Sequence, residues 1–245
     1  QHMRSDVPVG VSLSGGVDSS ALVACLKESG RLHDNVRAMF VHFGESYSEK
    51  PWVDKICQEF ALRLSSFEFS REEFKEYLAP MMWHLEGPLG GLMNCALTKV
   101  IKTARNCGIT VLQDGSGIDE AFGGYRSHHN LFLNTLWANK SQRLEQALRD
   151  YARNWGVSYD AALFVASASA LDAPVTIDGT SPIRPEVLHP SVFGYISEAE
   201  LTRLQLNVGE NPLLTSLCDF LQTSKIPRNT RMKDRSSMAF GIELR

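Results

Sequence analysis

The segment SGGVDSS, residues 14–20, combines two glycines with an aspartate and three serines, and it follows the short, mostly apolar run PVGVSL. Glycines let a backbone approach a ligand closely, and a helix beginning near Val17 would add the partial positive charge of its N-terminus. The serine hydroxyls can donate hydrogen bonds to phosphate oxygens. Asp18 would repel a bare phosphate, but it can bind Mg²⁺ that a polyphosphate carries. We interpret the segment as a nucleotide site; the alternative is a turn whose polar side chains only cap the helix.

A second polar segment, QDGSGIDEAFGGY at residues 113–125, holds the carboxylates of Asp114, Asp119 and Glu120 beside four glycines. It follows the apolar run ITVLQD, which has the composition of a buried strand. The carboxyl ends of parallel strands share one edge of a sheet, so both polar segments should face the same crevice. Asp119 then becomes a second magnesium ligand opposite Asp18. The alternative is an acidic pair at a helix N-terminus.

A third segment, KIPRNTRMKDR at residues 225–235, is strongly basic. Such a run is typical of a solvated face or a nucleic-acid patch. Arg235, however, precedes the small, apolar stretch SSMAFGI, which would draw its surroundings inward. A cation held there could neutralise a leaving pyrophosphate.

Several classes of protein are excluded or disfavoured by what the sequence lacks. It has no G-x-x-x-x-G-K-[ST] and no G-x-G-x-x-G after a strand, which argues against an ordinary P-loop NTPase and a hydride-transfer enzyme. The five cysteines lack zinc-site spacing and favour a reducing, cytoplasmic setting. The net charge of −3 gives no global attraction for nucleic acid, and no apolar run is long enough to span a membrane.

The elements that must position these segments alternate between strand and helix patterns in the first half of the chain. Strands are expected at 8–13, 36–43, 65–69 and 109–114, with helices after residue 17, near 52–64, from 71 to a break near Pro80, and over 92–104. Alternation of this kind predicts an α/β fold, a doubly wound, mostly parallel sheet with helices on both faces.

After about Tyr125 the pattern becomes helical, with helices expected near 144–155, 158–170, 197–205 and 212–223 and an ordered, Pro-rich loop at 173–194. We expect residues 1–3 to be a cloning remnant, residues 4–130 to form the α/β core with the nucleotide site, and residues 131–245 to form a mainly helical lobe that returns Arg235 to the site.

These three segments, in this order, resemble the synthetase domain of the asparagine synthetase family. SGGVDSS fits the PP-loop motif S-G-G-x-D-S-S, DGSGIDEAFGGY fits S/D-G-x-G-x-D-E-x-F-G-G-Y, and DRSSMAFGIELR is similar to the family's late segment. The PP-loop alone is shared with other ATP pyrophosphatases; the matches together run from Arg4 to Arg245. The resemblance implies an adenine nucleotide alpha hydrolase-like core followed by a helical lobe.

The resemblance also implies a chemistry and its residues. Such domains activate a carboxylate with ATP and Mg²⁺, release pyrophosphate, and form an amide as an amine displaces AMP. Asp18 and Asp119 would bind the metal, and Arg235, Asp119 and Ser116 would be the catalytic side chains. The nucleotide would lie against ten positions: Ser12, Ser14, Gly15, Gly16, Asp18, Ser19, Ser20, Val41, Asp114 and Gly115.

Two positions depart from the family pattern. Ser116 stands where asparagine-forming members have a glutamate that assists the amine step, and a serine of ordinary pKa cannot act as that base unaided. Arg235 stands where they have a lysine. Aspartate is therefore not the expected substrate, and the acceptor is expected to be another small-molecule or sugar-linked carboxylate. The family also has a glutaminase domain before this region and a Pro-Phe-Leu-Asp motif after it, so we expect an excised domain.

The leading hypothesis is an AMP-forming amide ligase or amidotransferase component in the cytoplasm, supplied with ammonia by a glutaminase domain or subunit. An asparagine synthetase proper is the nearest alternative. A nucleotide-binding module without turnover and a tRNA-modifying ATP pyrophosphatase are the others. No membrane or nucleic-acid partner is expected, and EGPLGGLMN at 86–94 is a candidate for acceptor selectivity.

Overall fold

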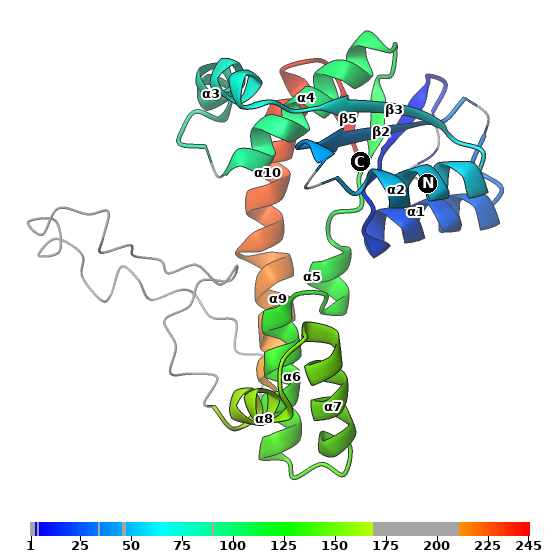
Figure 1. Ribbon diagram of the computed structural model, residues 1–245. Coiled ribbons are helices and arrows are strands. Elements are labelled where there is room, and N and C mark those ends of the chain that lie inside the picture. Colours follow the sequence, from blue (N-terminus) through cyan, green and yellow to red (C-terminus); the bar gives the residue numbers. More distant parts are fainter. Residues whose placement is uncertain (1–2, 4, 34, 46–47, 90, 169–210) are drawn as a thin grey trace, which may run out of the picture. The chain divides into compact units, whose positions relative to one another are not determined.

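Figure 1 shows the computed structural model, which describes residues 3, 5–33, 35–45, 48–89, 91–168 and 211–245. The expected helix near 197–205 and the Pro-rich loop at 173–194 lie outside these residues. The chain forms two compact units: unit 1 comprises residues 1–116 and 228–245, and unit 2 comprises residues 117–227. The boundary expected at residue 130 stays a prediction.

Unit 1 contains a parallel sheet of five strands in the order β3-β2-β1-β4-β5, which confirms the predicted α/β class. The strands are β1 Val9–Ser12, β2 Arg37–His42, β3 Arg63–Glu68, β4 Val111–Gln113 and β5 Glu243–Leu244. Its helices are α1 Val17–Glu28, α2 Lys50–Glu59, α3 Arg71–Leu85 and α4 Leu92–Asn106, with most of α10 Lys225–Met238.

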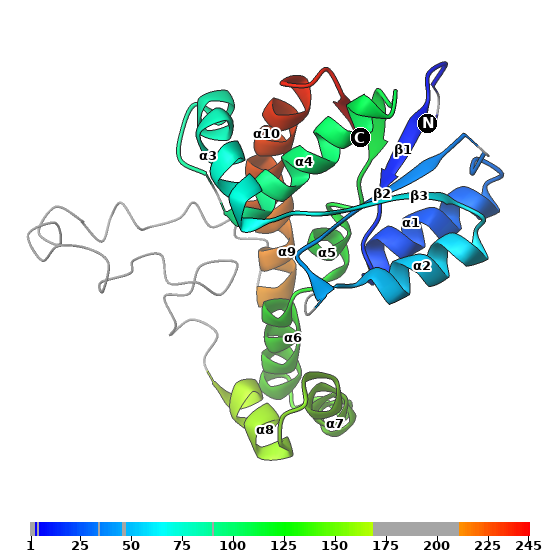
Figure 2. The ribbon, with the colours of Figure 1, turned by 45° about the horizontal axis from the view of Figure 1, so that its top comes forward.

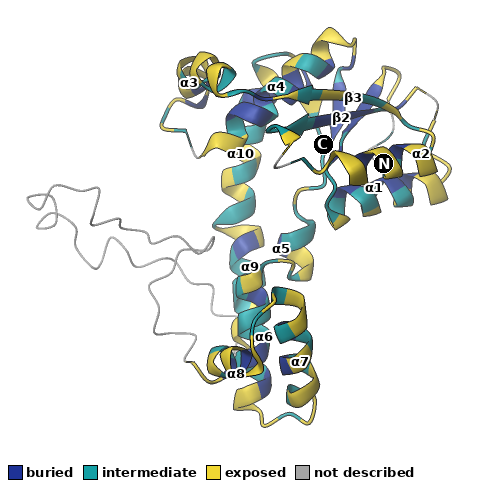
Figure 3. Ribbon diagram, in the orientation of Figure 1, coloured by how far each residue is buried: buried dark blue, intermediate teal, exposed yellow. Residues whose placement is uncertain are grey.

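Alternate residues of strand β2, which lies between β3 and β1, point to opposite faces of the sheet, as the period of a strand requires. Ala38 and Phe40 pack with α1 and α2, whereas Met39 packs with α4. Both faces of the sheet are therefore covered by helices (Figures 1 and 2). Buried residues concentrate in strands β1, β2 and β4 and on the inward sides of these helices (Figure 3).

Strand β5 was not expected from the sequence. Its backbone pairs with β4, since Glu243 N–H donates to Thr110 O at 2.8 Å and Arg245 N–H to Leu112 O at 2.9 Å. Asp114 N–H then donates to Arg245 O at 2.9 Å. The end of the described chain is thereby fixed beside the turn that follows β4.

The expected break of α3 near Pro80 is wrong, because the helix continues through Pro80 to Leu85. Proline removes one hydrogen bond to the carbonyl four residues earlier, here that of Glu76. Both Pro80 and Glu76 are exposed, so water can satisfy that carbonyl. Met81 and Leu85 are buried beyond the proline, and their burial favours continuation of the helix.

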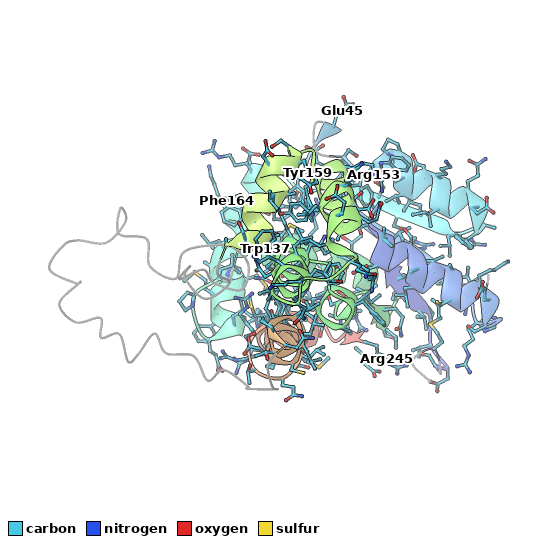
Figure 4. The ribbon with its side chains drawn as sticks, turned by 90° about the horizontal axis from the view of Figure 1, so that it is seen from below. Glu45, Trp137, Arg153, Tyr159, Phe164 and Arg245 are labelled. Carbon is cyan, nitrogen blue, oxygen red and sulfur yellow. The ribbon has the colours of Figure 1, made fainter. Side chains whose placement is uncertain are left out.

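Unit 2 is helical, as the sequence predicts for this half of the chain. Its helices are α5 Ile118–Phe122, α6 Arg126–Ala138, α7 Leu144–Trp155, α8 Tyr159–Ser167 and α9 Pro212–Gln222. The buried side chains of Leu133, Leu148 and Tyr151 and two alanines of α8 join α6, α7 and α8. Arg153 on α7 and Phe164 on α8 remain exposed (Figure 4).

Candidate functional site

The order of the strands locates a ligand crevice in unit 1. Strand β1 lies between β2 and β4, and the chain leaves β1 toward β2 on one side before it later returns to β4 on the other. In an open parallel sheet, ligands bind outside the carboxyl ends of the strands at such a switch point. Both the loop after β1 and the turn after β4 lie there, as the sequence predicts.

The loop after β1 is held by its own serines. Ser19 is buried; its Oγ accepts Ser14 N–H at 3.0 Å and donates to Ser14 O at 2.9 Å. Ser20 Oγ donates to Gly16 O at 2.7 Å. Gly16 is extended and gives no side-chain cap to α1, whose first turn contains Asp18. These bonds shape the loop, and no side chain caps the N-terminus of α1.

Gly15 is the loop residue at which only a glycine fits. A Cβ there would lie 2.8 Å from Glu49 Cβ and 3.0 Å from Trp52 Cβ. The same close approach lets Gly15 N–H donate to Glu49 Oε2 at 3.0 Å. The carboxylate of Glu49 thus accepts a hydrogen bond from a main-chain amide of the loop, as a phosphate oxygen would.

The turn after β4 packs closely on the start of α1. A Cβ on Gly115 would lie 3.4 Å from Ser19 N and 3.5 Å from the carbonyl carbon of Asp18. Within this turn, Ser116 N–H donates to Asp114 Oδ1 at 2.6 Å. The loop after β1 therefore contacts the turn after β4 within unit 1, as expected of two segments that share a crevice. Unit 1 contains the second of these segments only up to Ser116.

Lys233 of α10 completes this turn. Its ammonium lies 2.7 Å from Asp114 Oδ2 and also donates to Ser116 Oγ. Burial would raise the pKa of Asp114, but the charge of Lys233 and the hydrogen bonds from Lys233 and Ser116 outweigh it, so the pKa lies below its ordinary value. Asp114 and Lys233 form a mostly buried ion pair at the turn.

Arg235 contacts a different part of unit 1. Its guanidinium lies 2.7 Å from Glu86 Oε2 and donates to His84 O at 3.4 Å, both at the end of α3. The pKa of Glu86 is lowered mainly by the hydrogen bond from Arg235 and further by the positive charge of Arg235. Glu86 belongs to the segment considered for acceptor selectivity, so Arg235 lies beside that segment.

Asp119 lies in unit 2, in the first turn of α5, whereas Asp18 lies in unit 1, so their shared magnesium site stays a prediction. The neighbouring Glu120 is buried and accepts hydrogen bonds from Gly117 N–H at 3.1 Å and Tyr125 Oη at 2.6 Å. Glu120 thus performs the capping role that was the alternative interpretation of this pair.

A metal carried by a nucleotide is compatible with these carboxylates. Among the described residues, no group of three or more His, Cys, Asp or Glu side chains could hold a metal ion. Mg²⁺ bound to ATP needs only one or two protein carboxylates, because phosphates and waters supply the other oxygens. Asp18, in the first turn of α1, offers the type of oxygen that Mg²⁺ prefers.

The remaining predicted residues lie along the same edge. Ser12 ends β1 and Val41 lies near the end of β2, two residues beyond the partner of Ser12 in the sheet register. Sequence reasoning missed Glu49 and did not single out Lys233. No motif marks Glu49, and Lys233 was one of several cations in a basic run.

Comparisons with known proteins identify the family. The Asparagine synthase family model matches residues 1–245, and this chain belongs to that family. A putative asparagine synthetase [glutamine-hydrolyzing] 2 of Methanocaldococcus jannaschii is 35% identical over 129 residues, which are 53% of this chain and 25% of that protein. Asparagine synthetase [glutamine-hydrolyzing] 1 of Bacillus subtilis is 34% identical over 149 residues, or 60% and 22%. The matches thus span a quarter or less of these relatives.

Among solved structures, the U34-tRNA thiolase NcsA of Methanococcus maripaludis aligns with 97% of this chain and 72% of its own at 14% identity and a TM-score of 0.36. That similarity is too low to carry an argument about function. No described helix has both the length and the apolar character to cross a membrane.

Proposed function

We propose that this chain is the synthetase part of an enzyme that uses ATP to convert a carboxylate into an amide, with release of AMP and pyrophosphate. Membership of the asparagine synthetase family supports ATP-dependent amide synthesis in general. The observation that carries the proposal is the packing of the turn after β4 on the first turn of α1, which joins the two polar segments at the switch point of the sheet.

In the first step, an oxygen of the acceptor carboxylate attacks the α-phosphorus of ATP. The bond from that phosphorus to the bridging oxygen breaks, and pyrophosphate leaves with the electron pair. Amides of the loop at residues 14–20 and the N-terminus of α1 stabilise the phosphate charge. Mg²⁺, held by Asp18 and Asp119, would neutralise further charge on the polyphosphate.

In the second step, ammonia or another amine attacks the acyl carbon of the adenylate, AMP leaves, and the amine loses a proton. Ser12 and Val41 would contact the adenosine, and Asp114 and Gly115 would line the region of the adenylate. Ser116 and Arg235 remain proposed catalytic side chains. The curated relatives are named as glutamine-hydrolysing, which supports glutamine as the source of the ammonia.

The acceptor is proposed to be a small-molecule or sugar-linked carboxylate that need not be aspartate. Arg235 contacts Glu86 in the segment considered for acceptor selectivity, so that segment lies within reach of a cation. We place the enzyme in the cytoplasm.

Exchange of labelled pyrophosphate into ATP tests the proposal on the full-length protein. A panel of carboxylic acids that includes aspartate and sugar acids should contain at least one acid that supports exchange. Asp18→Asn should abolish that exchange, whereas the matched change Asp54→Asn on α2, outside the loop, should leave it intact. Binding of Mg·ATP without exchange for any acid would instead favour a nucleotide-binding module, and exchange that requires RNA would favour a tRNA-modifying enzyme.

A further inference from the structure

Lys233 and Arg235 cannot both serve the same bound phosphate from α10. Residues two positions apart on an α-helix are separated by about 160° around its axis, so they point to nearly opposite sides. The contacts agree with that geometry, because Lys233 pairs with Asp114 after β4 and Arg235 pairs with Glu86 after α3. Of these two cations, Lys233 is the one that contacts the turn that packs on the loop of residues 14–20.

The Lys233 ammonium is held in a fixed position. Asp114 Oδ2 and Ser116 Oγ accept two of its three N–H groups, which leaves one for a ligand. Asp114 is itself fixed by Ser116 N–H and by its own N–H bond to Arg245 O. The ammonium of Lys233 can therefore meet a phosphate oxygen as a hydrogen-bond donor and a positive charge.

We propose that Lys233 is a phosphate-binding residue of the nucleotide site and that Asp114 and Ser116 position its ammonium. This assignment rests on the proposed function, and it gives to Lys233 the contact with polyphosphate charge that the sequence suggested for Arg235. The arrangement also explains how a carboxylate can lie beside a polyphosphate, since Lys233 offsets the charge of Asp114.

Binding of Mg·ATP to the full-length protein, measured by calorimetry, tests this role. Lys233→Met should weaken binding at least about tenfold, because a charge-assisted hydrogen bond is lost. Lys233→Arg should recover most of the affinity. Arg228→Met removes the same charge from an exposed position of α10 and should leave affinity within about twofold. Affinity should also fall less with added salt in Lys233→Met than in the parent.

A double variant separates a ligand contact from a structural effect. Lys233→Met leaves Asp114 as an unpaired, mostly buried carboxylate, which can disturb the turn by itself. Asp114→Asn combined with Lys233→Met removes that charge. If Lys233 binds phosphate, the double variant stays weak; recovery of parental affinity would overturn the proposal.

Failure of this inference differs from failure of the proposed function. If the parent binds Mg·ATP and Lys233→Met binds it equally well, Lys233 has no role in binding and the nucleotide site stands. If the parent does not bind Mg·ATP at all, both proposals are wrong.

Discussion

The ion pair of Asp114 and Lys233 makes the stability of unit 1 depend on pH. The folded-state pKa of Asp114 lies below its ordinary value of 3.8, so the pair contributes fully above about pH 4. The contribution is lost as the pH falls through the folded-state pKa. The side chains are 14% and 20% exposed, so solvent screens the pair only in part.

We therefore expect Asp114→Asn to destabilise unit 1 by about 1–3 kcal/mol at pH 7, because the ammonium loses its charged acceptor. The difference from the parent should shrink as the pH is lowered toward 3. Hydrogen exchange of the β1 and β4 amides in the variant and the parent, at pH 7 and near pH 3, measures this difference in stability. A difference that is equal at both pH values would show that Asp114 does not act through its charge.

His128 makes the stability of unit 2 depend on pH, in a range higher than that of the Asp114–Lys233 pair. It is almost fully buried, and neither ring nitrogen has a hydrogen-bond partner among the described residues. Its ring packs against those of Phe220 and Tyr125, with centroids 4.7 and 5.4 Å away. Burial, with a smaller contribution from His129, lowers the pKa of His128. The folded state thus keeps this imidazole neutral where an unfolded chain would protonate it.

Unit 2 should consequently lose stability as the pH falls below about 6.5, by up to about 1.4 kcal/mol for each pH unit until the folded histidine is also protonated. His128→Phe should remove that dependence and, by removing two unsatisfied nitrogens, leave stability at pH 8 unchanged or up to about 2 kcal/mol higher. Hydrogen exchange of α6 amides between pH 5 and 8 checks this. Leu136→Met, a buried change without a titratable group, is the control and should retain the parental pH dependence.

Among the elements, α3 depends on a capping arrangement at its N-terminus. Ser70 Oγ accepts Glu73 N–H at 3.1 Å, while Glu73 Oε2 accepts Ser70 N–H at 2.9 Å. Lys99 of α4 lies 2.5 Å from Glu73 Oε1, so the same carboxylate joins the two helices. This helix ends at Leu85, directly before Glu86, the partner of Arg235.

Ser70→Ala should destabilise unit 1 by about 1 kcal/mol, because the Glu73 amide loses its acceptor at the helix start. Ser70→Asp should retain the cap and most of the stability. Urea unfolding followed by circular dichroism measures both. Equal stability of Ser70→Ala and the parent would mean that water replaces the cap without loss.

The elements of unit 1 could be predicted from sequence where periodicity was clear. Strands β1, β2, β3 and β4 and helices α1 and α4 lie close to their expected positions, because buried strands and one-sided helices leave a pattern. The two residues of β5 are too few to show a periodic pattern in the sequence, and the strand is recognised from its pairing with β4. The course of α3 through Pro80 depends on tertiary burial, which propensity does not describe.

The candidate site was predictable to the extent that topology determined it. Parallel strands place the loop after β1 and the turn after β4 at one edge, so Asp114 and Gly115 could be expected near Ser19. The roles of Lys233 and Arg235 could not be assigned, because the choice between them depends on the rotation of α10 about its axis. The contact of Glu49 with Gly15 N–H depends on side-chain packing that follows no spacing rule.

Considered as a whole, unit 1 is assembled from two segments separated by all of unit 2. Residues 1–116 supply four strands, whereas residues 228–245 supply β5 and Lys233. Lys233 and Asp114 are 119 positions apart in sequence. Folding of the candidate site therefore includes the entropic cost of closing a long loop, which contacts of the late segment must offset.

Ile242 should provide a large share of that compensation. Its side chain is fully buried with Ile101, Ala104 and Leu112, on the face of the sheet that α4 covers. Ile242→Ala should destabilise unit 1 by about 2–5 kcal/mol, whereas Met238→Ala, at a position 52% exposed in the same segment, should change stability by about 0.5 kcal/mol or less. Hydrogen exchange should show faster exchange at Asp114 and at the β1 and β4 amides in Ile242→Ala alone. Unchanged protection of β1 would mean that the sheet folds without its last strand, and the late segment would then dock on a core that is already formed.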